Sequence, residues 1–578
     1  MKKVSLVLWF CLFSISSFLR EFKAEGHGVY IVYMGAKGSS DDHIHLMSSL
    51  TTRRKNAVDD AIADRVDIIN LSIGQPAGAE DEFSRNPIAI GAFHAVQKGI
   101  FVVASAGNDR PLEETVVNVA PWIFTVAATT IDRNIETHIL LGGNKIIKVL
   151  SFSDLNKSLV YPLLDSLSVK LHGEFVYDGD ARDCEPDTLH EHKVEGKIIV
   201  CEHLDDDYSL NDRLGEVRKK GVIGFILLLP DDELITAPKI RSFPGAVIIQ
   251  EDGIKILSYI NSTRNPVATI LPTVTVDNFK LAPVVAFFSS RGTNYNTRSL
   301  LKPDIAAPGT AVLAAWPANN TKLTRSGQEP PLFNSNSGTS MPCAHASGIA
   351  AILKSQNPTW SLSAIRSAIM TTAFQQSNLK SPIVNSVYGE SLATPYAFGA
   401  GVATMSGPLK PGLVYETEIT DYLQFLCSTG YNTSTIKLIS KTLPNDSPYP
   451  PGSSDDSVSN MNYPSIAVSL SKVRETKEVT RTLTRISDEE SECTAIITAP
   501  DVLRVEVSPK KLKFTSDRKK LSYQMTFKAM SRERIFWINN MGQCRGRINQ
   551  GSRRCHGTHK PLAELIYSMS IWKKLHIY

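Results

Sequence analysis

The chain has 578 residues, well beyond the roughly 100 to 200 residues of an ordinary domain, so we expect several domains. Its 62 Lys and Arg residues nearly balance its 58 Asp and Glu residues, which gives a formal net charge of +4. This balance argues against a dedicated nucleic-acid-binding protein, which would carry a clustered basic excess. Peptides or proteins are the expected partners.

The N-terminus has the layout of a signal peptide. Lys2 and Lys3 precede an apolar run over residues 4–18, and Ala24 offers a cleavage position. The prediction is a signal peptide over residues 1–24 and a secreted, extracellular protein. A membrane anchor is the alternative, but it requires about 20 apolar residues. We expect no membrane span later in the chain.

Cysteines and glycosylation sequons fit secretion, because disulfides form in oxidising compartments. Removal of Cys11 with the signal peptide leaves an odd number of cysteines, so one thiol must stay unpaired. These seven are Cys184, Cys201, Cys343, Cys427, Cys493, Cys544 and Cys555. Sequons occur at Asn156, Asn261, Asn319, Asn432 and Asn445; a further match at Asn70 lies in an apolar strand, where we expect no glycan.

The first half of the chain alternates strands and helices. Residues 29–34 form a short strand, and 66–74 form an apolar strand of the kind that is buried on both faces of a parallel sheet. A helix over 87–97 and a strand over 100–104 follow. This order predicts a βαβ unit and an α/β fold.

The later chain changes pattern twice. Short strands at 197–201 and 222–228 between acidic loops predict an inserted domain over 155–280. Helices at 339–354 and 362–373 then return, the second with Ser361 as N-cap. Farther on, alternating strands predict a small antiparallel sandwich, at 465–470, 478–486, 504–507 and 521–527. No period is legible after residue 531.

Ser340 is the first candidate for chemistry. It lies at the start of a helix whose small residues at helical spacing indicate close packing against a neighbour. The free N–H groups and the dipole at such a helix start favour negative charge, which suits a nucleophilic hydroxyl if a base can take its proton. Taken alone, Ser340 would more often be a capping residue.

Asn108 is the second candidate. It ends the buried segment Val102-Val-Ala-Ser-Ala-Gly-Asn. An Asn after Gly can simply form a turn.

Taken together, the segments around Ser340 and Asn108 resemble two motifs of a known family. Gly338-Thr-Ser-Met-Pro342, followed by a helix of small residues, resembles the serine motif of the subtilisin family, and Ala106-Gly-Asn108 resembles its oxyanion motif. The resemblance implies that Ser340 is a nucleophile and that Asn108 donates its side-chain amide to the oxyanion. It also implies a peptide-binding cleft lined by Ser72, Ile73, Gly74, Ser105 and Gly107.

Other segments resemble the plant secreted subtilases, in the right order up to about residue 530. Phe288–Gly292 and Lys302–Gly309 resemble the two blocks before the serine motif. The fold implied is an incomplete subtilisin-like parallel sheet with helices on both faces. The domains implied are a truncated inhibitor propeptide at 27–58, catalytic parts at 59–154 and 281–410, a protease-associated β-rich domain at 155–280, a fibronectin-III-like β-sandwich at 455–530 and an unassigned tail at 531–578. Within the inserted domain, Cys184 and Cys201 are expected to be bonded.

The Asp and His of the catalytic triad are the parts of the pattern that we do not find. In this family both precede Ser340, with His as the base and Asp as the group that orients it. No strand ending in Asp-Thr/Ser-Gly occurs, and His43 and His45 belong to propeptide-like sequence. Up to Val58 the sequence resembles the middle of the propeptide, whereas from Asp59 it resembles a segment well inside the catalytic domain. We predict that a contiguous block is missing there.

Two decoys remain. His556-Gly-Thr-His559 spells the family's His motif but follows Ser340 and lies in the tail. A zinc site built from these histidines with Cys544 and Cys555 matches no familiar spacing, so we expect no metal or cofactor. His345 is read as a packed helix residue.

The predicted function is therefore a secreted serine endopeptidase by family, inactive or severely impaired as written. The alternatives are a non-catalytic secreted protein that binds peptides, and a mis-spliced gene model.

Overall fold

The computed structural model describes the chain from Val58 to Ile571 with gaps. The residues outside the description are 1–57, 79–81, 110, 151–159, 173–175, 204–209, 230–242, 293–299, 317–331, 386–390, 442–457, 471–472, 488, 498, 500, 531–534, 541–568 and 572–578. The predicted signal peptide and most of the predicted propeptide, with His43 and His45, lie outside the described residues. So do Cys544, Cys555, His556 and His559. The chain divides into two compact units.

The first unit is built on a four-stranded parallel sheet in the order β1-β2-β3-β12. Its strands are β1 (Ile68–Leu71), β2 (Phe101–Ser105), β3 (Phe124–Thr129) and β12 (Ile305–Pro308). All side chains of β1, β2 and β3 are buried, as expected for a sheet covered on both faces. The helix predicted between the first two strands is α2 (Pro87–Gln97), capped by the side chain of Asn86. The predicted βαβ unit is confirmed.

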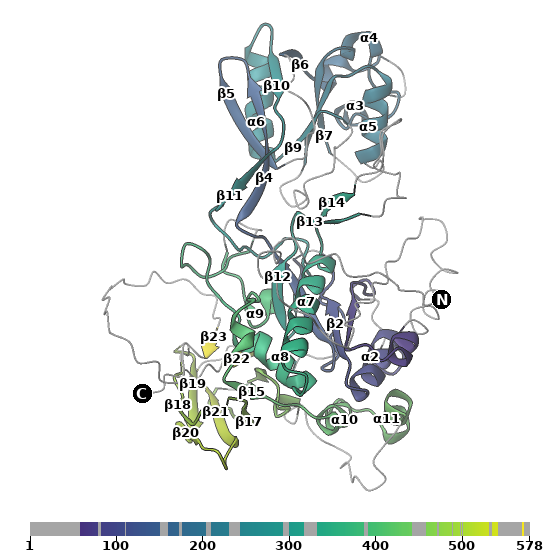
Figure 1. Cartoon of the computed structure of the whole chain (residues 1–578). Coiled ribbons are helices and arrows are strands. Elements are labelled where there is room, and N and C mark those ends of the chain that lie inside the picture. Colours follow the sequence, from purple (N-terminus) through teal and green to yellow (C-terminus); the bar gives the residue numbers. More distant parts are fainter. Residues whose placement is uncertain are drawn as a thin grey trace. The chain divides into compact units, whose positions relative to one another are not determined.

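Helix α7 (Ser340–Gln356) packs along this sheet and contacts all four strands (Figure 1). Its buried face carries small or compact side chains such as Cys343, Ala346 and Ala350, which allow the helix backbone to approach the sheet closely. Helix α8 (Leu362–Thr371) follows, and Ser361 caps it by accepting a hydrogen bond from the N–H of Ala364 at 3.1 Å. Both predicted helices and the predicted N-cap are confirmed.

The second unit comprises Thr130–Ala282 and Thr310–Ser337. Its main sheet has the order β11-β4-β10-β6-β7-β8-β9, with β5 paired to β4. The strands are β4 (Arg133–Leu141), β5 (Lys145–Leu150), β6 (Tyr161–Asp165), β7 (Ile198–Glu202), β8 (Gly224–Leu228), β9 (Gly245–Ile248), β10 (Val267–Ile270) and β11 (Val274–Asp277). β6 to β9 run parallel, whereas β4 pairs antiparallel with β5, β10 and β11. This unit begins earlier than residue 155 because β4 belongs to its sheet.

Helices and a hairpin complete the second unit. The helices are η1 (Ser166–Val169), α3 (Asp178–Arg182), α4 (Glu191–Val194), α5 (Leu210–Lys219) and α6 (Gln250–Ser262). The hairpin pairs β13 (Val312–Ala315) with β14 (Phe333–Asn336). Cys184 and Cys201 form a disulfide, as the resemblance implied. Two other cysteines, Cys343 and Cys427, are free, so more than one thiol stays unpaired.

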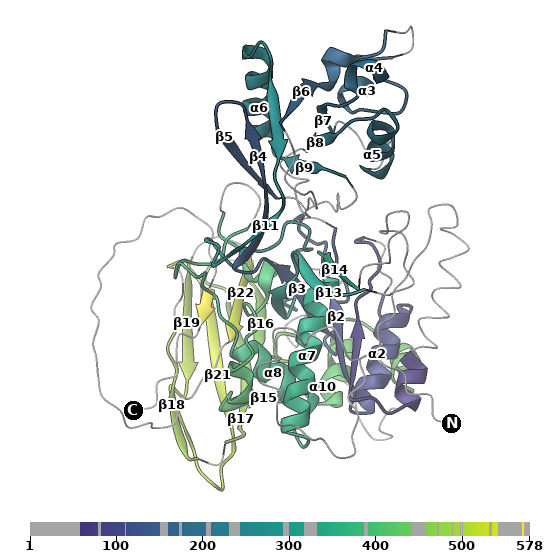
Figure 2. The same cartoon turned by 45° about the horizontal axis from the view of Figure 1, so that its top comes forward.

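The C-terminal part of the first unit is a β-sandwich (Figure 2). One sheet has the order β15-β17-β21-β19, a second has the order β16-β22-β23, and a third pairs β18 with β20. The strands are β15 (Leu413–Tyr415), β16 (Ser465–Ser469), β17 (Thr476–Arg485), β18 (Ser491–Thr494), β19 (Leu503–Ser508), β20 (Lys511–Phe514), β21 (Lys520–Ala529), β22 (Ile535–Asn540) and β23 (Met569–Ile571). The four predicted strands are confirmed, and the tail that showed no legible period supplies β22 and β23.

The chain enters this sandwich, leaves it and returns. β15 pairs with β17, although it lies well before the predicted sandwich boundary at residue 455. The chain then forms α10 (Ile419–Ser428) and α11 (Thr433–Ser440), whose apolar side chains join the core of the parallel sheet. Two short helices, α9 (Pro395–Phe398) and η4 (Gly407–Leu409), precede β15 in the chain; α9 contacts β3 and η4 contacts α8. The sandwich and the parallel sheet are therefore interleaved in one unit.

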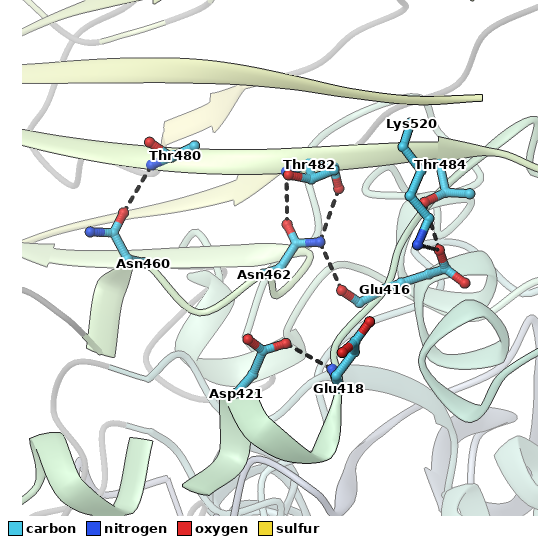
Figure 3. A pocket seen from close by; sticks show the side chains of 9 residues that line it. All are labelled: Glu416, Glu418, Asp421, Asn460, Asn462, Thr480, Thr482, Thr484 and Lys520. Carbon is cyan, nitrogen blue, oxygen red and sulfur yellow. Dashed lines mark hydrogen bonds and ion pairs between the residues drawn. The ribbon is translucent and has the colours of Figure 1, made fainter. Parts of the chain in front are cut away.

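A polar seam ties β15 to the sandwich. The side-chain amide of Asn462 donates to the carbonyl oxygens of Glu416 at 2.8 Å and Thr482 at 3.0 Å, and its Oδ1 accepts from the N–H of Thr482 (Figure 3). Lys520 Nζ lies 3.1 Å from Glu416 Oε2. These contacts line an open polar pocket that lies in the sandwich and its linker.

Asp304, just before β12, is the centre of a buried charged cluster. Its carboxylate accepts hydrogen bonds from Lys302 Nζ at 2.6 Å, from the N–H of Thr125 at 2.7 Å and from the hydroxyl of Tyr463 at 2.5 Å. Lys302 and Asp304 have no exposed side-chain surface. Tyr463 lies directly before the sandwich, so this cluster joins the sheet to the C-terminal region.

Arg366 on α8 extends the cluster. Its guanidinium lies over the ring of Tyr463, 5.0 Å from the centroid, and donates to the hydroxyl of Tyr422 at 2.8 Å. Burial raises the pKa of Tyr463 well above its usual value. The cluster is a structural one, because all of its members are enclosed.

In the described parts of the chain, no helix is both long and apolar enough to cross a membrane.

Candidate active site

Ser340 is the first residue of α7, and Thr339 precedes the helix as its N-cap residue. The Ser340 hydroxyl donates to the carbonyl oxygen of Ser72 at 3.2 Å, while the Ser72 hydroxyl donates to the carbonyl oxygen of Ser340 at 3.0 Å. This reciprocal pair joins the helix start to the segment that follows β1. The unpaired N–H groups of the first turn make this position favourable for a developing negative charge.

Asn108 is held beside Ser340 by Thr339, the residue that precedes Ser340. The N–H and the hydroxyl of Thr339 both donate to Oδ1 of Asn108, each at 2.9 Å. These two bonds use the oxygen of the side-chain amide, so the amide hydrogens are directed elsewhere and can serve a ligand. A preoriented amide donor beside a hydroxyl is the arrangement that stabilises an oxyanion in acyl transfer.

The loop that carries Asn108 is braced from behind by Ser290. The N–H of Ser290 donates to the carbonyl oxygen of Gly107 at 3.0 Å, and its hydroxyl accepts from the N–H of Asp109 at 3.1 Å. Gly107 has a φ of +102°, and a Cβ there would lie 2.7 Å from the Ser290 hydroxyl. Ser290 thus fixes the backbone on both sides of Asn108.

Two segments beyond the ends of β1 and β2 form the candidate peptide-binding surface. Carbonyl groups alternate in direction along a strand. The carbonyl of Asp67 accepts from the N–H of Phe101 on the β2 side, and that of Ile73 faces the same side. The carbonyl of Ser72 faces the opposite edge, where it accepts from the Ser340 hydroxyl, and continued alternation predicts the same direction for the backbone groups of Gly74.

Asn70 links β1 to the serine helix below this surface. Its Oδ1 accepts hydrogen bonds from the Cys343 thiol at 3.1 Å and from the Ser347 hydroxyl at 2.9 Å, and its amide donates to the Ser72 hydroxyl at 2.9 Å. Asn70 is 1% exposed, which agrees with our expectation that its sequon carries no glycan. Burial raises the pKa of Cys343 to about 12, so this thiol is an inert packing group.

Family comparison decides the identity of this arrangement. Residues 40–401 match the model of the subtilase family, Peptidase_S8. The chain belongs to the subtilase family. Residues 460–546 match a fibronectin type-III domain, which covers the C-terminal sandwich except β15 and β23. The predicted family, its subtilisin-like α/β fold and the C-terminal fibronectin type-III domain are thereby confirmed.

Two curated relatives of this subtilase come from Arabidopsis thaliana. It is 48% identical to the CO(2)-response secreted protease over 82% of its own length and 61% of that protein. It is 47% identical to subtilisin-like protease SBT5.1 over 82% of its own length and 60% of that protein. The chain therefore spans about three fifths of the relatives that it matches. Among solved structures, a psychrophilic subtilisin-like protease, Apa1 from Pseudoalteromonas sp. AS-11, aligns at 13% identity over 62% of this chain and 73% of that one, with a TM-score of only 0.26.

The subtilase site has no partner that could activate Ser340 within the described residues. The hydroxyl's acceptor is a backbone carbonyl, which is far too weak a base to take a proton from serine. His345, five residues along α7, interacts with the backbone of Pro308 and Met341, and burial lowers its pKa. The interpretation of His345 as a packed helix residue agrees with its place in the helix.

The open polar pocket described above lies away from Ser340. The pocket of Figure 3 is lined by Glu416, Glu418, Asp421, Asn460, Asn462, Thr480, Thr482, Thr484 and Lys520, none of which belongs to the site. The described residues contain no group of three His, Cys, Asp or Glu side chains able to hold a metal ion. The sequence analysis assigned no role to Ser290, since a serine inside an apolar block gives no signal of which backbone it contacts.

Proposed function

We propose that this chain is the serine-bearing portion of a secreted subtilisin-like endopeptidase. Ser340 is the nucleophile, Asn108 is the oxyanion donor, and a substrate peptide lies along Ser72–Gly74 and Ser105–Gly107. The supporting observation is the pair of bonds from Thr339 that holds the Asn108 amide oxygen at the residue before Ser340 and leaves its N–H groups available to a ligand.

We further propose that the chain as written is inactive or severely impaired. A serine nucleophile needs a general base, and neither the triad His nor its orienting Asp has a counterpart next to Ser340 among the described residues. In subtilisin, loss of the triad leaves only a residual acceleration of roughly 10³–10⁴-fold over water, from the oxyanion hole and substrate binding.

The proposed cause is a missing block at the junction of Val58 and Asp59. It would remove the rest of the propeptide, the first strands of the sheet and both triad residues. In support, β1 pairs with β2 on one side, and no other strand of the described chain pairs with its second edge. Its side chains are nevertheless fully buried, as in a central strand. Sequencing the transcript across this junction tests the proposal: a continuous reading with no additional block contradicts a gene-model error.

A fluorophosphonate probe tests the chemistry. The purified secreted chain should show little labelling, because Ser340 has no base, whereas a chain with the block restored should label rapidly. Ser340→Ala in the restored chain is the control and should abolish labelling. Rapid Ser340-dependent labelling of the chain as written would contradict the proposed impairment.

A second candidate function is non-catalytic binding of peptides by a secreted protein. The observation in its favour is that Ser340 and Asn108 keep an ordered arrangement without a base. Secretion is supported by the disulfide of the second unit and by the exposed sequons Asn261 and Asn432. The identification of that unit as a protease-associated domain also remains a proposal. Peptide binding by the folded chain without cleavage would favour this function.

A further inference from the structure

Asn118 joins the two segments of the candidate cleft at the point where their strands stop pairing. The β1–β2 ladder ends with Leu71 beside Ala104. Beyond it, the Nδ2 group of Asn118 donates to the carbonyl oxygen of Ile73 and to that of Ser105, each at 2.8 Å. One side-chain amide therefore replaces the missing ladder bonds.

The chemistry of this position calls for asparagine. Asn118 has a φ of +58°, in the left-handed region where Asn is among the few side chains tolerated. A side-chain amide offers two N–H groups on one atom without carrying a charge, whereas Lys and Arg would bring a charge into this buried position. Asn118 is 3% exposed, and the Thr125 hydroxyl donates to its backbone carbonyl at 2.8 Å. The amide thus has a fixed backbone and no water to compete with its two bonds.

The neighbouring residue fills the same space. A Cβ at Gly74 would lie 2.8 Å from Cγ2 of Val117, and a Cβ at Gly107 would lie 3.1 Å from the same atom. Val117 is 1% exposed. Both residues of the Val117–Asn118 pair therefore contact both segments, one by packing and the other by hydrogen bonds.

We propose that Asn118 is a positioning residue, which fixes the separation and direction of the two peptide-binding segments. By holding the Ile73 carbonyl on the β2 side, it turns the backbone groups of Ser72 and Gly74 toward the edge shared with Ser340. An extended peptide added at that edge pairs with these groups as an additional strand. This inference rests on the proposed function, because it assumes that peptide binds there.

The test compares the full chain with Asn118→Gly, which keeps the left-handed backbone and removes the amide. Asn144→Gly is the matched control, since Asn144 also has a positive φ, +63°, but lies exposed in the turn between β4 and β5. Amide hydrogen exchange reports on the segments, and fluorescence polarisation with fluorescein-labelled peptides from a casein digest reports on binding. Losing two buried hydrogen bonds should raise exchange of 72–74 and 105–107 and weaken the peptide Kd, each about tenfold or more. Asn144→Gly should change neither.

The two readouts separate the inference from the proposed function. Unchanged exchange and unchanged Kd in Asn118→Gly would overturn the positioning role. If exchange rises as expected but the unaltered chain binds none of the peptides, the proposed function fails and the structural link remains.

Asn118→Asp is a second variant of nearly the same shape, and it remains informative if Asn118→Gly does not fold. Its ionised carboxylate offers no donor to the two carbonyl oxygens, whereas the protonated acid offers one. Peptide affinity, or segment protection where no peptide binds, should therefore recover in part on acidification, relative to the unaltered chain. Absence of any recovery in a folded Asn118→Asp protein would count against the proposal.

Discussion

The first unit contains two polar clusters of opposite character, one fully buried around Asp304 and one partly exposed around Ser340. The cluster around Asp304 is charged, and burial lowers the pKa of Lys302 to about 8 and raises that of Tyr463. The cluster around Ser340 is built from hydroxyls, amides and backbone groups, with Asn108 as its most polar side chain. Strongly shifted pKa values usually mark catalytic centres. Here they mark the join between the sheet and the sandwich, whereas the hydrogen bonds around Ser340 in the described chain involve hydroxyl, amide and backbone groups.

The difference shows that the arrangement of Ser340 and Asn108 does not depend on charged groups among the described residues. The geometry of Asn108 depends on backbone bonds from Thr339 and Ser290, which need no charged group. Proton transfer from Ser340 does need one. The groups that orient Asn108 and a base for Ser340 would come from different parts of the chain, so the first can be intact when the second is missing.

The largest expected effect concerns the charged cluster. Asp304→Ala leaves Lys302 buried without its carboxylate, and removal of one partner of a buried pair should lower the free energy of unfolding by about 3–5 kcal/mol. The matched control is Glu506→Ala, which breaks an exposed pair with Arg504 and should cost less than about 1 kcal/mol. Urea denaturation measures both. Equal losses would mean that the Asp304 cluster does not stabilise the join.

The serine cluster should respond to backbone shape instead of charge. Gly107→Ala places a Cβ against the Ser290 hydroxyl at a positive φ, and should cost about 2–4 kcal/mol. Gly99→Ala has a similar sign of φ, +79°, with no atom within 4 Å of the added Cβ, and should cost about 1–2 kcal/mol. The same denaturation assay compares them. A loss in Gly107→Ala no greater than in Gly99→Ala would show that Ser290 does not constrain the oxyanion loop.

The pH dependence of stability tests the charged cluster without disrupting its packing. The folded pKa of Lys302 is about 8 and its ordinary value is 10.5, so between these values the unfolded chain binds a proton that the folded chain has released. Stability should therefore rise as pH increases from 8 toward 10, by at most about 1.4 kcal/mol per pH unit. Denaturation of Lys302→Met over the same range should lack this rise, which removes the contribution of other groups. Parallel pH profiles for the two proteins would exclude a lowered Lys302 pKa.

The smallest expected effect is that of Ser340, the proposed nucleophile. Ser340→Ala removes one neutral, half-buried hydrogen bond to Ser72, and should change the free energy of unfolding by only about 0.5–1 kcal/mol. Thermal unfolding measures it, with Ser347→Ala as a control for a fully buried hydroxyl that bonds Asn70. A loss at Ser340 that exceeds the loss at Ser347 would indicate that the serine is kept for stability and not for chemistry.

Local patterns predicted the elements around the site well. The apolar run over 66–74, the small-residue helix after Ser340 and the N-cap at Ser361 are determined by neighbouring residues; the helix and the cap were confirmed, and the strand is present but shorter than predicted, at Ile68–Leu71. β15 was missed because three residues next to Pro411-Gly412 carry no strand period, and only pairing with β17 makes them a strand. β22 was missed for the same reason, since its partner β16 lies about 70 residues earlier.

By itself the sequence determined the family and the two chemical groups that the site presents, because the strings around Ser340 and Asn108 are contiguous. It also showed that no Asp or His motif precedes them. Tertiary structure decided what holds those groups in place. Thr339 donates to the Asn108 oxygen, Ser290 accepts from the loop that carries Asn108, and Asn118 donates to the segment beyond the end of β1. These contacts join residues distant in the chain, and a hydrogen bond depends on positions in space that no local pattern encodes.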